Sequence, residues 1–257
     1  MSVILGKKIL ARPNKDIYIS KNGKLLVKVF HHQSVSASEV LGEAMNQALV
    51  EEATDLLIPK LVEVYKKGKD WCIAYQYIEG TTLEEMMKKD PAADQKYIED
   101  LLDLQLKMAG HKVMKLPSLV NKLQSRISES KDIIPATTRY ELHLRLDAVP
   151  KHDKLVHGDF VPSNIIYTPE GKVYILDWAH AARGNGSADC CYTYLNLVLD
   201  GREDLAKYYL NLFCTKTDTA YQYVTRWLPI IAAVMAKKET GERRKKLLSM
   251  TDVVEYM

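Results

Sequence analysis

The sequence lacks a long apolar run. Its longest strongly apolar stretch near the carboxyl end, residues 228–236, contains Pro229 and is far shorter than the ~20 residues that cross a bilayer. We predict a buried helix there and no membrane partner. The first ten residues hold few apolar side chains before Lys7 and Lys8, so they lack the apolar core of an export signal. A cytoplasmic location is therefore expected.

Cysteine is also scarce. The four cysteines are Cys72, Cys190, Cys191 and Cys214, and they form no Cys-x-x-Cys pair and have no histidines at zinc spacing. A disulfide framework and a structural zinc site are therefore not indicated. We interpret the cysteines as reduced core residues.

An excess of one charge is missing as well. The net charge of +3 is too small to indicate a nucleic-acid partner. Residues 1–78 hold 11 basic and 8 acidic side chains, and residues 79–257 hold 25 of each. The charged run 242–246 could bind an anion, but a run at helical spacing is more often a solvated face.

The pattern that is present predicts an α+β protein. Apolar and charged fractions of 47% and 27% are typical of a globular chain. Short runs rich in Ile and Val, separated by turn residues, predict five antiparallel strands, and a helical pattern that begins at Ser38 and extends to residue 57 interrupts them. The strands are expected at 7–11, 16–20, 25–30, 61–67 and 70–78.

After Gly80 the pattern becomes mainly helical. Thr81 is a plausible cap for a helix over 83–89, and Pro91 begins another that continues to 109. One hairpin, residues 164–178, interrupts these helices. We therefore predict a small lobe, residues 1–78, and a larger helical lobe, residues 79–257.

The strongest chemical signal is His157-Gly158-Asp159, followed by Asn164 and then by Asp177 at the end of the hairpin. Both later residues stand at the ends of apolar strands that would direct them to one point. Phosphoryl transfer needs a carboxylate to orient the acceptor hydroxyl and oxygen ligands to hold magnesium against the phosphates. Turn capping would explain each residue alone but not the complete spacing.

With this motif the chain resembles the protein-kinase-like superfamily, and within it a bacterial branch of the aminoglycoside phosphotransferase and choline kinase family. The resemblance implies a two-lobed protein-kinase-like fold. It makes Asp159 the catalytic base and Asn164 and Asp177 ligands of Mg²⁺, with ATP or GTP as co-substrate.

The resemblance also requires a lysine on the third strand and a glutamate on the next helix. Lys28 has apolar neighbours on both sides, which is an unusual place for a charge without a ligand or an ion pair. A solvated edge lysine is the alternative. Glu43 is the favoured partner because Glu43-Ala44 matches the family's usual helix, and Glu39 is the second candidate.

Further assignments follow from the resemblance alone. Residues 74–83 look like the hinge between the lobes, where the backbone of Gln76, Tyr77 and Ile78 would meet the base. Asp189 would brace the catalytic loop by analogy, although capping of the following helix is equally plausible. His157 is expected to be a packed loop residue.

One departure from the family is the loop over residues 11–16, which has no glycine where kinases carry a glycine-rich flap. Glycine allows close backbone approach to phosphate. The loop could therefore hold nucleotide more weakly, or Asn14 and Lys15 could contact phosphate directly.

The leading hypothesis is a Mg²⁺-dependent phosphotransferase that moves the terminal phosphoryl group of ATP or GTP to a hydroxyl of a small molecule. A protein kinase is disfavoured because eleven residues between Asp177 and Asp189 leave little room for a peptide-docking segment, and no Ala-Pro-Glu follows. A pseudokinase, a nucleotide-binding regulatory module without turnover, is the alternative. The balanced charge of 79–257 does not support a strong preference for cationic acceptors, and Asp252 and Glu255 are acidic candidates by position only. No feature identifies a protein partner.

Overall fold

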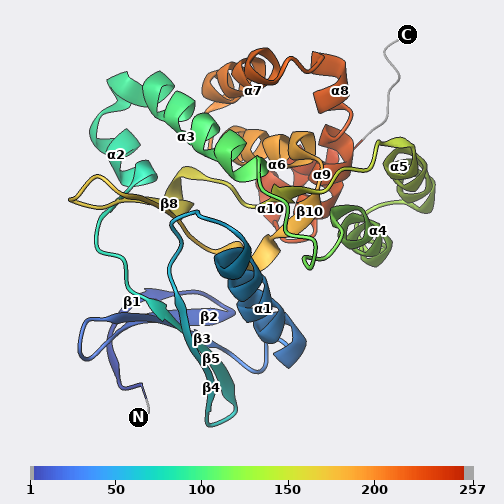
Figure 1. Cartoon of the computed structure of the whole chain (residues 1–257). Coiled ribbons are helices and arrows are strands. Elements are labelled where there is room, and N and C mark those ends of the chain that lie inside the picture. Colours follow the sequence, from blue (N-terminus) through green and yellow to red (C-terminus); the bar gives the residue numbers. More distant parts are fainter. Residues whose placement is uncertain (1–2, 252–257) are drawn as a thin grey trace. The chain divides into compact units, whose positions relative to one another are not determined.

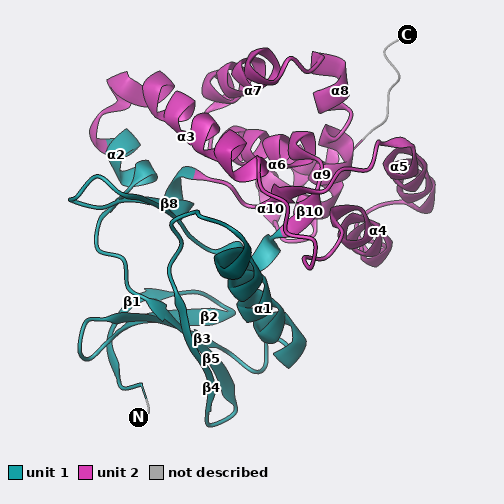
Figure 2. Cartoon of the chain, in the orientation of Figure 1, with its two compact units in different colours: residues 1–88, 162–181 teal, residues 89–161, 182–257 magenta. Residues whose placement is uncertain are grey.

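The computed structural model describes residues 3–251, so Asp252 and Glu255 lie outside the described residues. The chain forms two compact units. Unit 1 comprises residues 1–88 and 162–181, and unit 2 comprises residues 89–161 and 182–257 (Figure 2). The hairpin after the catalytic motif therefore belongs to the smaller unit. The division into functional lobes at residue 78 stays a prediction.

Unit 1 is built on a five-stranded antiparallel sheet in the order β1-β2-β3-β5-β4 (Figure 1). Gly23 and Gly68 have positive φ values of 73° and 63°, which the tight turns of two hairpins require. The predicted five strands are confirmed. They are β1 (Leu5–Ala11), β2 (Lys15–Ser20), β3 (Leu25–Phe30), β4 (Leu61–Lys67) and β5 (Asp70–Gln76).

Helix α1 (Ala37–Ala53) packs against one face of this sheet, where Val40 and Ala44 join a buried cluster with Phe30, Ile73 and Tyr75. The predicted bounds of the helix were wrong at both ends. The helix begins at Ala37 and not at Ser38, and Ser36 caps it in a reciprocal capping box with Glu39. The helix ends at Ala53 because Thr54 already has extended backbone angles.

A second, three-stranded sheet in unit 1 has the order β6-β8-β9. The predicted hairpin is confirmed as β8 (Ile165–Tyr167) and β9 (Val173–Ile175), and β6 (Thr81–Thr82) pairs with β8. Thr81 is therefore a strand residue and not the predicted cap. Thr82 caps α2 (Leu83–Lys89), since its Oγ1 accepts from the Glu85 amide at 3.1 Å.

Unit 2 is mainly helical, with one short ribbon in which β7 (Lys154–Val156) pairs with β10 (Ala182–Gly184). Pro91 begins a 3-10 turn, Pro91–Ala93, and the predicted helix follows it as α3. The helices are α3 (Asp94–Ala109), α4 (Leu119–Glu129), α5 (Ala136–Ala148), α6 (Gly186–Leu199), α7 (Glu203–Thr217), α8 (Tyr221–Thr225), α9 (Leu228–Ala236) and α10 (Gly241–Leu248).

The core of unit 2 includes α9, in which residues 230–236 are all buried, as the apolar stretch predicted. Cys190 and Cys191 are buried in α6, and burial raises the pKa of both thiols. Within residues 3–251, no helix has the length and apolar composition of a membrane span.

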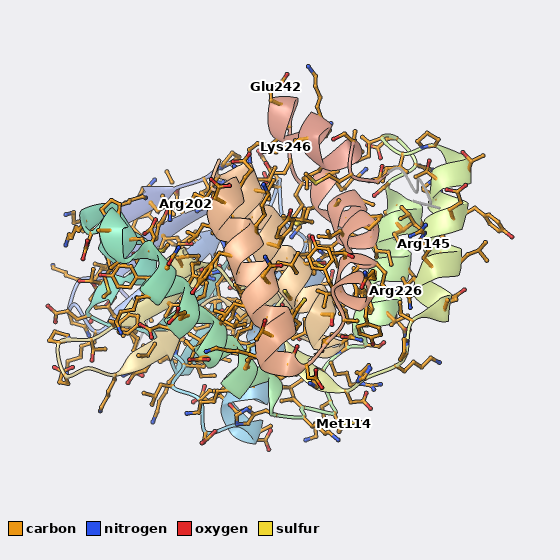
Figure 3. The ribbon with its side chains drawn as sticks, turned by 90° about the horizontal axis from the view of Figure 1, so that it is seen from above. Met114, Arg145, Arg202, Arg226, Glu242 and Lys246 are labelled. Carbon is orange, nitrogen blue, oxygen red and sulfur yellow. The ribbon has the colours of Figure 1, made fainter. Side chains whose placement is uncertain are left out.

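The charged run 242–246 forms α10, and Glu242 projects from its outer end (Figure 3). Three of the four basic residues of this helix pair with acidic neighbours: Arg243 with Asp200, Lys245 with Glu242, and Lys246 with Glu203. Arg244 donates to the backbone oxygens of Ala236 and Glu239. These pairs favour the interpretation of the run as a solvated face rather than an anion site.

Candidate active site

The centre of the candidate site in unit 1 is Lys28, which lies on β3 opposite Ile17 and Ile73 and is only 6% exposed. Its Nζ lies 2.7 Å from Glu43 Oε1 and 3.0 Å from Asp177 Oδ1. Glu43 thus takes the partner role for which Glu39 was the second candidate, because Glu39 is engaged at the helix cap. Strand, helix and hairpin each contribute one member of this charged triad.

The carboxylates around Lys28 keep its ammonium group charged. Burial alone would lower the pKa of Lys28, but the carboxylates of Asp177 and Glu43 raise it above its usual value. Tyr75 donates a hydrogen bond from its hydroxyl to Glu43 Oε1 at 3.0 Å. Burial and then the Glu43 charge raise the pKa of Tyr75, so its hydroxyl stays protonated and remains a donor.

Asp177 follows β9 and adopts left-handed backbone angles, φ 60° and ψ 67°, which few residues other than glycine take. Its Oδ2 lies 3.8 Å from Lys15 Nζ. Burial would raise the pKa of Asp177, but the ammonium groups of Lys28 and Lys15 hold it well below its usual range. The unusual backbone therefore presents an ionised carboxylate to two lysines.

Helix α1 also holds the segment that follows Asp177. Asn46 Nδ2 donates to the carbonyl oxygens of Ala179 at 3.1 Å and Ala181 at 3.4 Å. Asn46 lies three residues after Glu43, and residues at that spacing share one helix face. The sequence interpretation missed Asn46, although this spacing was a usable signal. The same helix thus positions both Glu43 and the backbone next to Asp177.

Asn164 ends a 3-10 turn, Pro162–Asn164, and leads into β8. Its carbonyl oxygen accepts from the Leu176 amide at 2.8 Å, and Ile165 pairs with Ile175 in the β8-β9 register. Asn164 and Asp177 therefore stand at the same end of one hairpin. A carboxylate and an amide oxygen are ligands that suit Mg²⁺, so these two residues fit the metal that the resemblance implies.

Asp159 lies in unit 2, in the loop that follows β7, and is half-buried. Asp189, in the first turn of α6, fixes this loop. Its carboxylate accepts from the amides of Gly158 at 2.7 Å and His157 at 3.3 Å. The capping role left open for Asp189 belongs to Asn185, whose side chain accepts from the Ser187 amide. Asp189 therefore braces the loop.

The residue that follows Asp159 in the loop is held by α6 as well. Thr193 Oγ1, one turn after Asp189 on α6, donates to the Phe160 carbonyl oxygen at 2.8 Å. His157 and Phe160 are fully buried and their rings meet edge to face, with centroids 5.6 Å apart. His157 is thus a packed loop residue, as predicted. Asp159 lies between residues whose backbone and side chains are held by α6.

The predicted hinge residues begin with Gln76, the last residue of β5, and continue beyond the strand. The Gln76 amide donates to Lys60 O at 2.8 Å and the Tyr77 amide to Lys24 O at 2.9 Å. Among residues 3–251, no backbone hydrogen bond uses the amide of Ile78. At Gly80, an added Cβ would come within 2.4 Å of Tyr167 O, so the chain after residue 78 approaches β8 as only glycine allows.

The model of the phosphotransferase enzyme family matches residues 14–224, and no curated protein matched the sequence. A structure of aminoglycoside phosphotransferase APH(4)-Ia in complex with ADP and hygromycin B is similar, with TM-score 0.70 and 11% identity over 95% of this chain and 90% of that chain.

Two further solved structures share the fold. Choline kinase LicA from Streptococcus pneumoniae has TM-score 0.61 and 15% identity over 98% of this chain and 92% of that chain. The gentamicin complex of APH(2")-IIa has TM-score 0.60 and 14% identity over 96% and 93%. Fold and family match together confirm the predicted resemblance: this chain belongs to the phosphotransferase enzyme family.

Proposed function

We propose that the protein transfers the terminal phosphoryl group of ATP or GTP to a hydroxyl group of a small molecule, with Mg²⁺ as the metal. The observation that carries the proposal is the triad of Lys28, Glu43 and Asp177 within one compact unit. Burial of an ion network costs desolvation free energy and is weak evidence for a role in stability, which favours a functional role for this lysine. The hairpin that supplies Asp177 begins at Asn164.

In this proposal Lys28 binds phosphate oxygens of the nucleotide, and Glu43 with Tyr75 holds the lysine in position. Asn164 and Asp177 are the metal ligands. Mg²⁺, when bound, would neutralise charge on the phosphates, which is a main source of catalysis in phosphoryl transfer. The base would lie along the hinge formed by residues 76–78, with the Ile78 amide as a backbone donor.

Asp159 acts as the general base. The acceptor hydroxyl oxygen forms a bond to the terminal phosphorus, the bond from that phosphorus to the bridging oxygen of the nucleotide breaks, and the hydroxyl proton passes to Asp159. The nucleoside diphosphate leaves with the bridging oxygen. The bracing of residues 157–160 by α6 supports this role because a general base must be held within hydrogen-bonding reach of its substrate.

The solved relatives support a small molecule as acceptor. Two of them are aminoglycoside phosphotransferases in complex with hygromycin B or gentamicin, and the third is a choline kinase. These compounds belong to those proteins, and the acceptor of this chain is proposed only as a small molecule with a free hydroxyl. Nucleic acid and membrane are not proposed as partners, and a cytoplasmic location stays a prediction.

A nucleotide-turnover assay tests the proposal. Wild-type protein with Mg²⁺ and ATP or GTP should release nucleoside diphosphate slowly alone and faster with a productive acceptor from a panel of amino sugars, aminoglycosides, choline-like amines and nucleosides. Asp159→Asn should remove this release while nucleotide binding persists. Equal release by wild type and Asp159→Asn would contradict the base assignment. Nucleotide binding without turnover with any acceptor would instead favour the pseudokinase alternative.

A further inference from the structure

The loop between β1 and β2 is a fixed turn and not an open flap. The Arg12 amide donates to Lys15 O at 2.9 Å and closes the turn. The His31 amide, just after β3, donates to Asn14 O at 3.0 Å, and His31 Nδ1 lies 3.1 Å from Pro13 O. Proline and these bonds fix the backbone, so the loop has little freedom to fold its own amides around a phosphate.

The turn places Lys15 on the same face of the sheet as Lys28. Lys15 pairs with Phe30, and Ile17 pairs with Lys28, in the β2-β3 register. Residues two apart on a strand point to the same face, as do directly paired residues on neighbouring strands. Asp16 therefore points to the opposite face, where it pairs with Lys8 at 2.7 Å.

The side chain of Lys15 is directed inward. It is 15% exposed, against 46% for Lys8, and its Nζ lies 5.7 Å from the Phe30 ring centroid. Its nearest carboxylate is Asp177, at 3.8 Å from Oδ2, while Lys28 takes Oδ1 of the same group at 3.0 Å. Two ammonium groups thus share one carboxylate inside the site.

This arrangement is unfavourable by itself. Both lysines are largely removed from water, and like charges around one carboxylate repel each other. Asp177 is also the proposed Mg²⁺ ligand, so the same carboxylate would serve a metal and both lysines at once. A ligand with several negative oxygen atoms would relieve both conflicts because it supplies acceptors for the second ammonium group.

Asn14 does not share these properties. It is exposed, and its backbone oxygen is already the acceptor for His31. The sequence offered two loop residues for phosphate contact. Lys15 carries a charge and lies beside Asp177, whereas Asn14 is uncharged.

We propose that Lys15 is a second cation for the triphosphate of the nucleotide and replaces the backbone donors that a glycine-rich loop would supply. The inference rests on the proposed function, because it concerns the same nucleotide. It extends that function by explaining how a glycine-free loop can hold phosphate.

The test compares ATP with adenosine by isothermal titration calorimetry in EDTA, so that neither metal binding nor turnover enters the result. Lys15→Met keeps an apolar stem against Phe30 but removes the charge. We expect it to weaken ATP binding by about 10- to 100-fold, the range for a lost charge-assisted hydrogen bond, and to leave adenosine binding unchanged. Lys15→Arg should recover most of the ATP affinity.

Lys8→Met is the matched control because it removes a lysine from the opposite face of the same sheet. It should bind ATP and adenosine as wild type does. Lys15→Met with wild-type ATP affinity would overturn the inference, and so would an equal loss for ATP and adenosine, which would mean a structural role. If Lys15→Met does not fold, Lys15→Gln and the salt dependence of ATP affinity in Lys15→Arg replace it.

The failure of the proposed function gives a different result. Wild-type protein that binds neither ATP nor GTP, with or without Mg²⁺, contradicts the nucleotide site itself, and the role of Lys15 falls with it. Wild-type protein that binds ATP and loses nothing in Lys15→Met contradicts only the inference about Lys15.

Discussion

Lys28 and Glu43 are fifteen residues apart in the sequence, and their charged groups lie 2.7 Å apart with both side chains only 8% exposed. Solvent screens a pair so little exposed only weakly. Removal of either charge would therefore leave the other buried without compensation, which costs free energy of folding. The same ammonium group reaches Asp177, 149 residues further along the chain. Stability and nucleotide binding are therefore expected to respond together to changes at this pair.

Lys28→Met should destabilise the protein by about 3 kcal/mol, because Glu43 and Asp177 would lose their main counter-ion. The free energy of unfolding in urea measures the effect. Lys28→Met combined with Glu43→Gln should lose less than the sum of the single changes, since the second change removes an uncompensated charge. Additive losses would mean that the pair is not coupled.

Asp159→Asn should lower kcat by about 10²- to 10⁴-fold, the usual contribution of a general base, with little effect on nucleotide affinity. Asp177→Ala should lose turnover and also the Mg²⁺ dependence of nucleotide binding, because the carboxylate is a proposed ligand of the metal. Titration of ATP with and without Mg²⁺ separates the two variants. A fall in ATP affinity in Asp159→Asn would argue against its role as base.

Asp189→Ala should unfold more easily by about 2 kcal/mol, because it leaves the buried amides of His157 and Gly158 without their acceptor. It should also lower kcat, since the loop that carries Asp159 loses its brace. Adenosine affinity should not change, because the proposed hinge lies in unit 1 and Asp189 in unit 2. Thermal unfolding and steady-state kinetics check both effects, and full activity in Asp189→Ala would show that the brace is dispensable.

Gly80→Ala should be destabilising by more than about 1 kcal/mol, because the new Cβ would lie 2.4 Å from Tyr167 O and 2.6 Å from Ile166 Cγ2. Gly42→Ala is the control. Gly42 lies within α1 with no atom within 4 Å of its added Cβ, so alanine there should stabilise by about 0.5–1 kcal/mol. Melting temperatures of the two variants should therefore move in opposite directions.

Local patterns predicted the elements better than their ends. Short runs rich in Ile and Val, bounded by turn residues, identified the five strands, and two apolar runs around a turn identified the hairpin of β8 and β9. The caps at Ser36 and Thr82 were missed because several Ser and Thr residues stand near each helix start, and the choice among them depends on which backbone turns first. Helix α1 was predicted too long because its helical period continues past Ala53 into an extended segment.

The sequence by itself determined the chemistry available to this protein: the spacing of Asp159, Asn164 and Asp177, the lysine within an apolar strand, and the family to which they belong. These follow from residue type and position along the chain. Only the tertiary structure decided the partners. It placed Glu43, the partner that the resemblance favoured, against Lys28. It also set the Asp189 carboxylate against the amides of the catalytic loop and brought Lys15 to Asp177.

The sequence shows the residue types but not their partners because the two depend on interactions of different range along the chain. Periodicity reports which face of an element is buried, because that depends on neighbours within a few residues. An ion pair depends on distance in space, and Lys15 and Asp177 meet only because β2 pairs with β3 while the hairpin of β8 and β9 ends beside them. Contacts made by packing between distant segments carry no local pattern that a single sequence displays.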